Sequence, residues 1–314
     1  SNTKETRHGF AKCCTRHLCR SGSLSPFHSP NSRLMSPSPV PEGYVRGPVF
    51  FDGGADHSVY NEVARGAFWN LAGGYGARIA VLTANEDASD ADYGYAAAFQ
   101  ALEAARVQLV VVRDRASGHD RSLLQAVEQS TAVFLSGGHP LRWSTRIGGT
   151  PLATAIRRAN ACGKAVGAVG GSAAFLGNHM LVYREGETYP CMAPGLGLSN
   201  RILVAGHFVP ELHGQLLAQA IASNPYVLGI GLPDRAACIR RADGVLEVMG
   251  LASIMLVDGS GITSSNVLEW IPGKPFVAEG LRTIELAPDY RYDLENHQIL
   301  PPELPMPMPN RSSL

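Results

Sequence analysis

The feature that most constrains the fold is a regular alternation of short apolar segments with longer segments of helical spacing. Predicted strands cover 49–51, 78–82, 107–112, 131–135 and 164–169, and predicted helices cover 58–72, 91–105, 120–129, 151–162 and 172–181. This alternation is typical of an α/β protein with a mostly parallel sheet covered by helices on both faces. After about residue 225 the pattern becomes strand-rich, which predicts an antiparallel C-terminal extension along one edge of the sheet.

The composition narrows the range of partners. Lys+Arg and Asp+Glu each number 27, so the formal net charge is zero, and neither nucleic acid nor a membrane is expected as a partner. The chain contains no uninterrupted run of 18 apolar residues, so no transmembrane helix is predicted. We expect a cytoplasmic protein. The six cysteines show no CxxC spacing, so no zinc or redox motif is predicted.

Both ends of the chain differ from its middle. Residues 1–46 are rich in Ser, Pro and basic residues and are expected to form a disordered leader or extension, with an organelle-targeting segment as the alternative. Residues 47–290 are expected to form a single α/β domain. Five prolines between 301 and 309 predict an extended C-terminal tail, which we begin at residue 291.

Three glycine-rich loops follow predicted strands. They are Asp-Gly-Gly at 52–54, Ser-Gly-Gly at 136–138 and Gly-Gly-Ser at 170–172. Ligands of open α/β sheets bind beyond the carboxyl ends of the strands, so these loops are expected to converge on one site.

Ser172 stands between a predicted strand and a predicted helix. The small residues around it (Gly170, Gly171, Ala173 and Ala174) suit the sharp turn of a nucleophile elbow, although the strict G-x-S-x-G pattern is not met. A helix N-terminus also supplies free N–H groups that can stabilise an oxyanion. The alternative is an ordinary serine N-cap, which such positions favour.

A nucleophilic serine needs a base and an orienting acid. His207 follows the apolar run 202–206 and precedes a helical segment that starts at Pro210. Asp234 follows another apolar run, and its alternative role is that of a turn residue. His139 and His57 follow the other two glycine-rich loops and are the other candidates for the base. The alternative is that each is an ordinary surface histidine.

Six motifs together resemble the cyanophycinase-like branch of the S51 serine peptidases, which is related to aspartyl dipeptidase (peptidase E). They stand in the expected order at 51–54, 71–82, 134–139, 171–174, 205–208 and 229–234. The resemblance implies a flavodoxin-like sheet, akin to the class I glutamine amidotransferase fold, and a homodimer. It implies no metal and no organic cofactor.

The resemblance also assigns roles to residues. It implies Ser172 as nucleophile, His207 as base and Asp234 as orienting acid, with oxyanion-hole N–H groups from Gly138 and Ala173. The implied reaction is hydrolysis of an amide, peptide or isopeptide bond in a small-molecule or peptide substrate, through an acyl-enzyme.

The chain departs from the family at the positions that bind the charged groups of the substrate. Ala205-Gly206 and His139-Pro140 each stand where Asp-Gln is usual, and 209–215 contains no arginine. Relatives that cleave cyanophycin, a β-Asp-Arg polymer, hold substrate charges with such residues. We therefore expect an altered specificity for a less charged substrate. The residues expected to bind it are Gly54, His139, Glu211 and His213.

Two alternatives to a hydrolase remain open. One is an acyltransferase or cyclase in a biosynthetic pathway that uses the same nucleophile, and the other is an inactive homologue that binds a small molecule. A Ser172 hydroxyl well beyond hydrogen-bond reach of the His207 ring would favour the second alternative. A dinucleotide site is disfavoured because the G-x-G-x-x-G spacing is absent.

Overall fold

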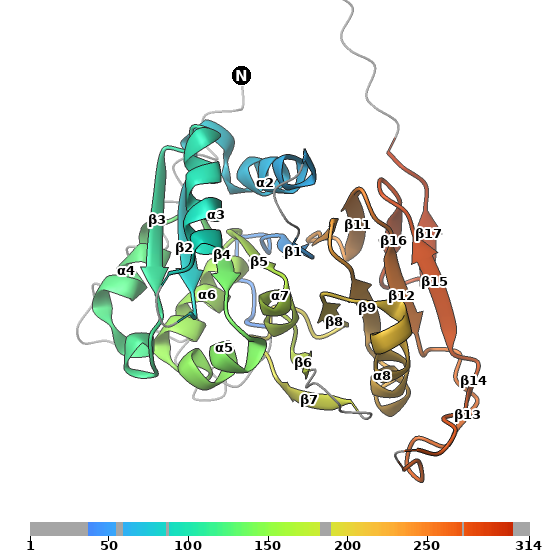
Figure 1. Ribbon diagram of the computed structural model, residues 1–314. Coiled ribbons are helices and arrows are strands. Elements are labelled where there is room, and N and C mark those ends of the chain that lie inside the picture. The colour runs from blue at the N-terminus through green and yellow to red at the C-terminus, as the bar shows by residue number, and fades with distance from the viewer. Residues whose placement is uncertain (1–36, 55–58, 86–87, 183–189, 272, 304–314) are drawn as a thin grey trace, which may run out of the picture.

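The computed structural model describes residues 37–54, 59–85, 88–182, 190–271 and 273–303. A nine-stranded sheet forms its centre, in the order β17-β16-β11-β10-β1-β5-β4-β2-β3 (Figure 1). The parallel block consists of β1 (Val49–Asp52), β5 (Ala165–Val169), β4 (Ala132–Gly137), β2 (Arg78–Thr83) and β3 (Arg106–Val111). Within it, β3-β2-β4-β5 has the 2-1-3-4 order of flavodoxin-like sheets, so the expected fold class is confirmed.

Helices cover both faces of this block, which explains why its strands are almost entirely apolar. One face packs against α2 (Val59–Ala72) and α3 (Asp90–Ala101), where Phe68 has ring centroids of Phe50, Phe99 and Phe134 within 5.6 Å. The other face packs against α4 (Arg121–Gln129), α5 (Pro140–Ile147), α6 (Pro151–Ala161) and α7 (Gly171–Phe175). Short 3₁₀ turns lie at Gly74–Gly76 and Ala116–His119.

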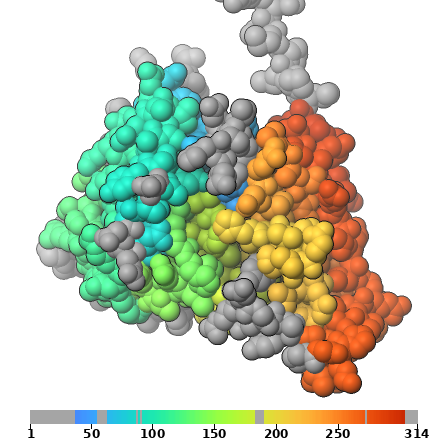
Figure 2. Space-filling model, in the orientation of Figure 1, coloured from blue at the N-terminus to red at the C-terminus, as the bar shows by residue number. Residues whose placement is uncertain are grey.

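Most of the remaining strands, which pair chiefly antiparallel, are divided between two sheets. Strands β10 (Ala236–Arg240), β11 (Val245–Gly250), β16 (Arg291–Asp293) and β17 (Gln298–Leu300) continue the central sheet beyond β1. A second sheet has the order β15-β12-β9-β8, with β8 (Ile202–Gly206), β9 (Leu228–Leu232), β12 (Ile254–Asp258) and β15 (Arg282–Leu286). Helix α8 (Pro210–Ser223) packs on that sheet. In the space-filling view the second sheet and α8 lie directly alongside the parallel block (Figure 2).

Two small antiparallel pairs complete the described elements. They are β6 (His179–Val182) with β7 (Cys191–Pro194), and β13 (Ser264–Ser265) with β14 (Ala278–Glu279). None of the helices in the described ranges combines enough length and apolar character to cross a lipid bilayer.

The structure corrects two expectations from sequence. The helix expected over 172–181 ends at Phe175, and its last three residues belong to strand β6, because a short, largely buried apolar strand has no periodicity that separates it from a buried helix. The start of the C-terminal tail was expected too early in the chain, at residue 291. Residues 291–300 contain β16 and β17, and Tyr292 is fully buried. Residues 1–36 of the expected leader and 304–314 of the expected tail lie outside the described residues.

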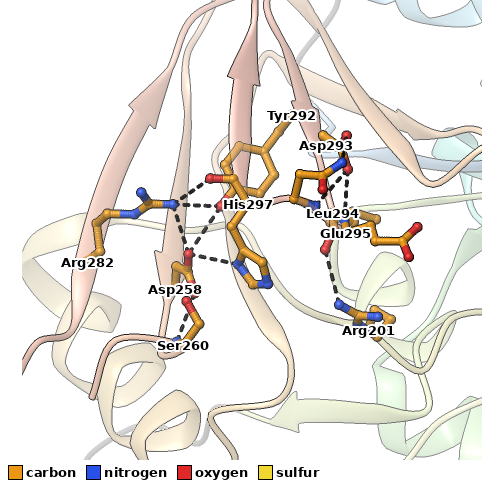
Figure 3. A network of polar contacts seen from close by, with 10 residues as sticks. Arg201, Asp258, Ser260, Arg282, Tyr292, Asp293, Leu294, Glu295 and His297 are labelled. Carbon is orange, nitrogen blue, oxygen red and sulfur yellow. Dashed lines mark hydrogen bonds and ion pairs between the residues drawn. The ribbon is translucent and has the colours of Figure 1, made fainter. Parts of the chain in front are cut away.

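A buried carboxylate fastens the β16–β17 hairpin to the second sheet (Figure 3). Asp258 Oδ2 accepts hydrogen bonds from Arg282 Nη2 at 2.9 Å and Tyr292 Oη at 3.2 Å, and lies 3.0 Å from Nδ1 of His297. The Asp258 side chain is only 3% exposed. Burial alone would raise the pKa of this carboxyl, but hydrogen bonds from Ser260 and the contact with His297 outweigh it and lower the pKa to about 2.

The network makes stability depend on pH at the acid end. A carboxyl has a pKa of about 3.9 in an unfolded chain, so the stabilisation by Asp258 is present above that pH and is lost as the pH falls toward the folded pKa. We expect Asp258→Asn to lower the free energy of unfolding at neutral pH by about 2 kcal/mol, and the difference from wild type to shrink on going from about pH 5 to about pH 2.

Urea denaturation at several pH values measures this difference. Glu269→Gln, at an exposed position, is the control and should have a small effect throughout. An Asp258→Asn difference that stayed constant over the acid range would contradict the assigned role.

Candidate active site

Ser172 lies just inside α7, directly after the end of β5, and is 1% exposed. The chain turns at Gly170, whose φ of 58° and ψ of −130° are essentially restricted to glycine. The unusual backbone conformation of the sharp turn therefore lies two residues before Ser172. The N–H of Gly170 donates to the carbonyl oxygen of Asp52 at 2.7 Å, which joins the loop after β1 to this turn.

The loop after β4 borders the Ser172 hydroxyl. Oγ of Ser172 lies within hydrogen-bond distance of the carbonyl oxygens of Gly137 (3.2 Å) and Gly138 (3.3 Å), and its single proton can serve one of them at a time. The indole Nε1 of Trp143 also donates to the Gly137 oxygen, at 2.8 Å. Gly138 has φ 93°, and a Cβ added there would lie 2.9 Å from Cβ of Ala84. The loop thus fits closely between Ala84 and Ser172.

His207 follows β8 and is brought over the same turn by close backbone packing. A Cβ added at Gly206 would collide with the carbonyl oxygen of Gly170, and a Cβ added at Gly170 would lie 2.5 Å from Nε2 of His207. His207 itself has φ 50°, an uncommon backbone conformation for a non-glycine residue. Its Nε2 therefore lies against Gly170, two residues before Ser172.

Asp234 completes the group from the end of the neighbouring strand. Because β8 and β9 are parallel, their carboxyl ends share one edge of the second sheet, and Nδ1 of His207 lies 2.9 Å from Oδ1 of Asp234. The next residue, Arg235, has φ 66°, and its N–H donates to the Gly54 oxygen at 2.8 Å. The expected convergence of the glycine-rich loops is thus present, and strands of both sheets contribute.

Exposure differs sharply across the group. The side chains of His207 and Asp234 are 63% and 60% exposed, whereas Ser172 is 1% exposed. A polar contact so open to water adds little to stability. Within the described part of the chain, Ser172 and His207 are not joined by a hydrogen bond, since the serine hydroxyl faces the carbonyls of the β4 loop.

The expected oxyanion donors lie on either side of Ser172. Gly138 approaches the hydroxyl through its carbonyl oxygen at 3.3 Å. The N–H of Ala173 donates to the Gly170 oxygen at 3.1 Å, so an oxyanion would have to share or replace that hydrogen bond.

Two of the expected substrate residues lie beside His207. A Cβ added at Gly54 would lie 3.9 Å from Cε1 of His207. His213 is half-buried, and its Nδ1 accepts the N–H of Val209 at 3.0 Å. Burial, and then the nearby His207, lower the pKa of His213.

The other two are exposed on the surface. His139 is exposed and caps α5, because its Nδ1 accepts the N–H of Leu141 at 3.2 Å. Glu211 is exposed in the first turn of α8. His57 lies outside the described residues.

Sequence reasoning missed two residues that hydrogen-bond to the end of β4, Trp143 at Gly137 and Asp92 at Ser136. Trp143 reads as an ordinary apolar residue, and its contact with Gly137 has no sequence signature. Asp92 forms a capping box with Ser89 at the start of α3, which a Ser-x-x-acid pattern could have predicted. Among the described residues, no group of three or more His, Cys, Asp or Glu side chains is arranged to hold a metal ion.

Known proteins similar in sequence identify the family. A cyanophycinase from Geminocystis herdmanii is 30% identical over 262 residues, which cover 81% of this chain and 96% of that protein. The chain belongs to the cyanophycinase family. A cyanophycinase from Synechococcus elongatus is also 30% identical, over 82% of this chain and 84% of its own length.

The remaining comparisons concern the fold. A peptidase from an acI-B1 actinobacterium has a solved structure that superposes with a TM-score of 0.57 at 15% identity, covering 78% of this chain and 98% of that one. No family model matches the chain. The family confirms the resemblance to cyanophycinase-like S51 peptidases and indicates a hydrolase.

The contact between Gly170 and His207 gives a direct test of the site's packing. We expect Gly170→Ala to lower the free energy of unfolding by about 1–3 kcal/mol, because φ 58° strains any L-residue and the added Cβ displaces the imidazole. Gly66→Ala is the matched control: Gly66 lies inside α2 with open space at its Cβ position, and alanine should stabilise a helix interior by up to about 1 kcal/mol. Urea denaturation compares the two, and wild-type stability in Gly170→Ala would contradict the described packing.

Proposed function

We propose that the protein is a serine-type peptidase that hydrolyses an amide, peptide or isopeptide bond through an acyl-enzyme. Ser172 is the nucleophile, His207 the general base and Asp234 the orienting acid. The observation that carries this proposal is the position of the His207 ring: Nδ1 lies 2.9 Å from Asp234, and Nε2 lies against Gly170, two residues from Ser172.

The steps follow from this geometry. The Nδ1–H of His207 donates to Asp234, which leaves Nε2 free to accept the Ser172 proton as Oγ bonds to the substrate carbonyl carbon. The imidazolium then protonates the leaving amine as the C–N bond breaks, and an ester to Ser172 remains. Water attacks the ester, His207 accepts its proton and returns it to Oγ, and the carboxylic acid is released.

One rearrangement precedes attack. The Ser172 hydroxyl turns from the carbonyls of Gly137 and Gly138 toward Nε2 of His207, since catalytic hydrogen bonds are often long or absent without substrate. The N–H groups of Gly138 and Ala173 then stabilise the oxyanion. Each such donor typically contributes about 10²–10³ to the rate.

The relatives are named for cyanophycin. The substrate of this protein is proposed to carry less charge than that polymer. Ala205 is fully buried, and Gly206 has no room for a Cβ against Gly170, so this backbone excludes the Asp-Gln pair usual in the family. Gly54 and His213 line the proposed binding site beside His207, and His139 and Glu211 form its outer part.

Water access favours hydrolysis over transfer to a second substrate. A hydrolase must admit water to its general base, and His207 and Asp234 are more than half exposed, although Ser172, which would carry the acyl group, is 1% exposed. The homodimer implied by the family resemblance stays a prediction, which light scattering on the purified protein tests.

A fluorophosphonate probe tests the nucleophile without knowledge of the substrate. We expect covalent labelling at Ser172, none in Ser172→Ala, and labelling at least about 100-fold slower in His207→Ala and Asp234→Asn. Ser199→Ala removes another buried serine hydroxyl and should retain the wild-type rate.

Mass spectrometry of the labelled peptide identifies the site. Folded wild-type protein that is not labelled, or is labelled at another residue, would refute the proposed function.

A further inference from the structure

A buried polar cluster lies behind the loop that borders Ser172. At its centre is Asp92, in the first turn of α3 and 0% exposed. Its Oδ1 accepts the hydroxyl of Ser136 at 2.7 Å. Its Oδ2 accepts Nδ2 of Asn85 at 2.9 Å, the N–H of Ser89 at 2.8 Å and the hydroxyl of Ser89 at 2.7 Å.

The two carboxylate oxygens serve different elements. Oδ2 completes the capping box of α3 with Ser89, a local contact three residues apart. Oδ1 reaches Ser136, 44 residues away at the end of β4. Helix capping therefore does not account for the second contact.

The cluster also lies directly against Gly137. A Cβ added at Gly137 would lie 2.5 Å from Oδ1 of Asp92 and 2.7 Å from Nδ2 of Asn85. The carbonyl oxygen of the same residue faces Ser172 Oγ at 3.2 Å. Asp92 and the Ser172 hydroxyl are thus separated by one residue of backbone.

Asp92 is suited to hold that backbone in place. Burial alone would raise the pKa of the Asp92 carboxyl, but hydrogen bonds from Ser136, Ser89 and Asn85 outweigh it and lower the pKa. Hydrogen bonds to an ionised acceptor are roughly twice as strong as those between neutral groups. The contact with Ser136 is therefore a firm anchor for the β4 loop.

We propose that Asp92 is a positioning residue for Ser172: through Ser136 it fixes Gly137 and Gly138, which border the nucleophile and supply one oxyanion donor. This inference rests on the proposed function. Asp92 touches neither the substrate nor Ser172 itself, so its effect on the reaction passes through the backbone of the loop.

Two variants and two controls test the inference. Ser136→Ala removes the anchor and leaves the capping box of α3 intact, and Asp92→Asn removes the charge. Ser130→Ala is the control for the first, since Ser130 is also 5% exposed and donates to Val127 just before the other end of β4. Asp120→Asn is the control for the second, since Asp120 caps α4 by accepting the N–H of Ser122 at 2.7 Å.

Fluorophosphonate labelling is resolved into the maximal inactivation rate and the probe concentration at half that rate. We expect Ser136→Ala and Asp92→Asn to lower the maximal rate about tenfold or more, with the half-rate concentration unchanged, because misplaced groups slow the reacting step. Both controls should stay within about twofold of wild type. The inference would be overturned if variants and controls alike lost maximal inactivation rate in proportion to the fall in their melting temperatures.

Amide hydrogen exchange gives a second readout that needs no activity. Exchange in the peptide covering 136–139 should be faster in Ser136→Ala and Asp92→Asn than in wild type and both controls. Unchanged exchange there overturns the inference, whatever the labelling shows. If wild type is not labelled at all, the proposed function fails, and the exchange rates alone decide whether Asp92 holds the loop.

Discussion

The candidate site depends on a contact between two glycines from different sheets. Gly206 at the end of β8 lies so close to the carbonyl oxygen of Gly170, after β5, that neither position has room for a side chain. This approach brings the carboxyl edge of the second sheet against that of the parallel block. Ser172 belongs to one sheet and the His207–Asp234 pair to the other, and in this chain the contact between the two glycines brings them together.

The parallel block could be predicted from the sequence because its signals are local. Apolar runs separated by helical segments gave the strands, and the Gly-Gly pairs marked their carboxyl ends. The second sheet could not be predicted, since β8, β9, β12 and β15 pair across up to 32 positions and periodicity does not encode pairing partners. The β16–β17 hairpin was missed because its strands have three residues each, too short for an alternating pattern.

The site was predictable only in part. Local sequence left Ser172 open as an N-cap and Asp234 open as a turn residue. The family motifs favour a catalytic role for both, and His207 and Asp234 are in contact in the structure. Asp92 could not be linked to the β4 loop, because its contact with Ser136 spans 44 residues and depends on how α3 packs on the sheet. Buried polar contacts of this kind are set by tertiary structure and have no local pattern.

The glycine contact also limits how this chain can acquire new substrate preferences. A side chain at 206 would separate the two sheet edges, so replacements there would disturb the site before they changed its selectivity. Variation is tolerated where side chains already project into solvent, as Glu211 and Leu212 do in the first turn of α8. Directed evolution of the enzyme would therefore gain most from libraries in that turn, with the strand ends kept fixed.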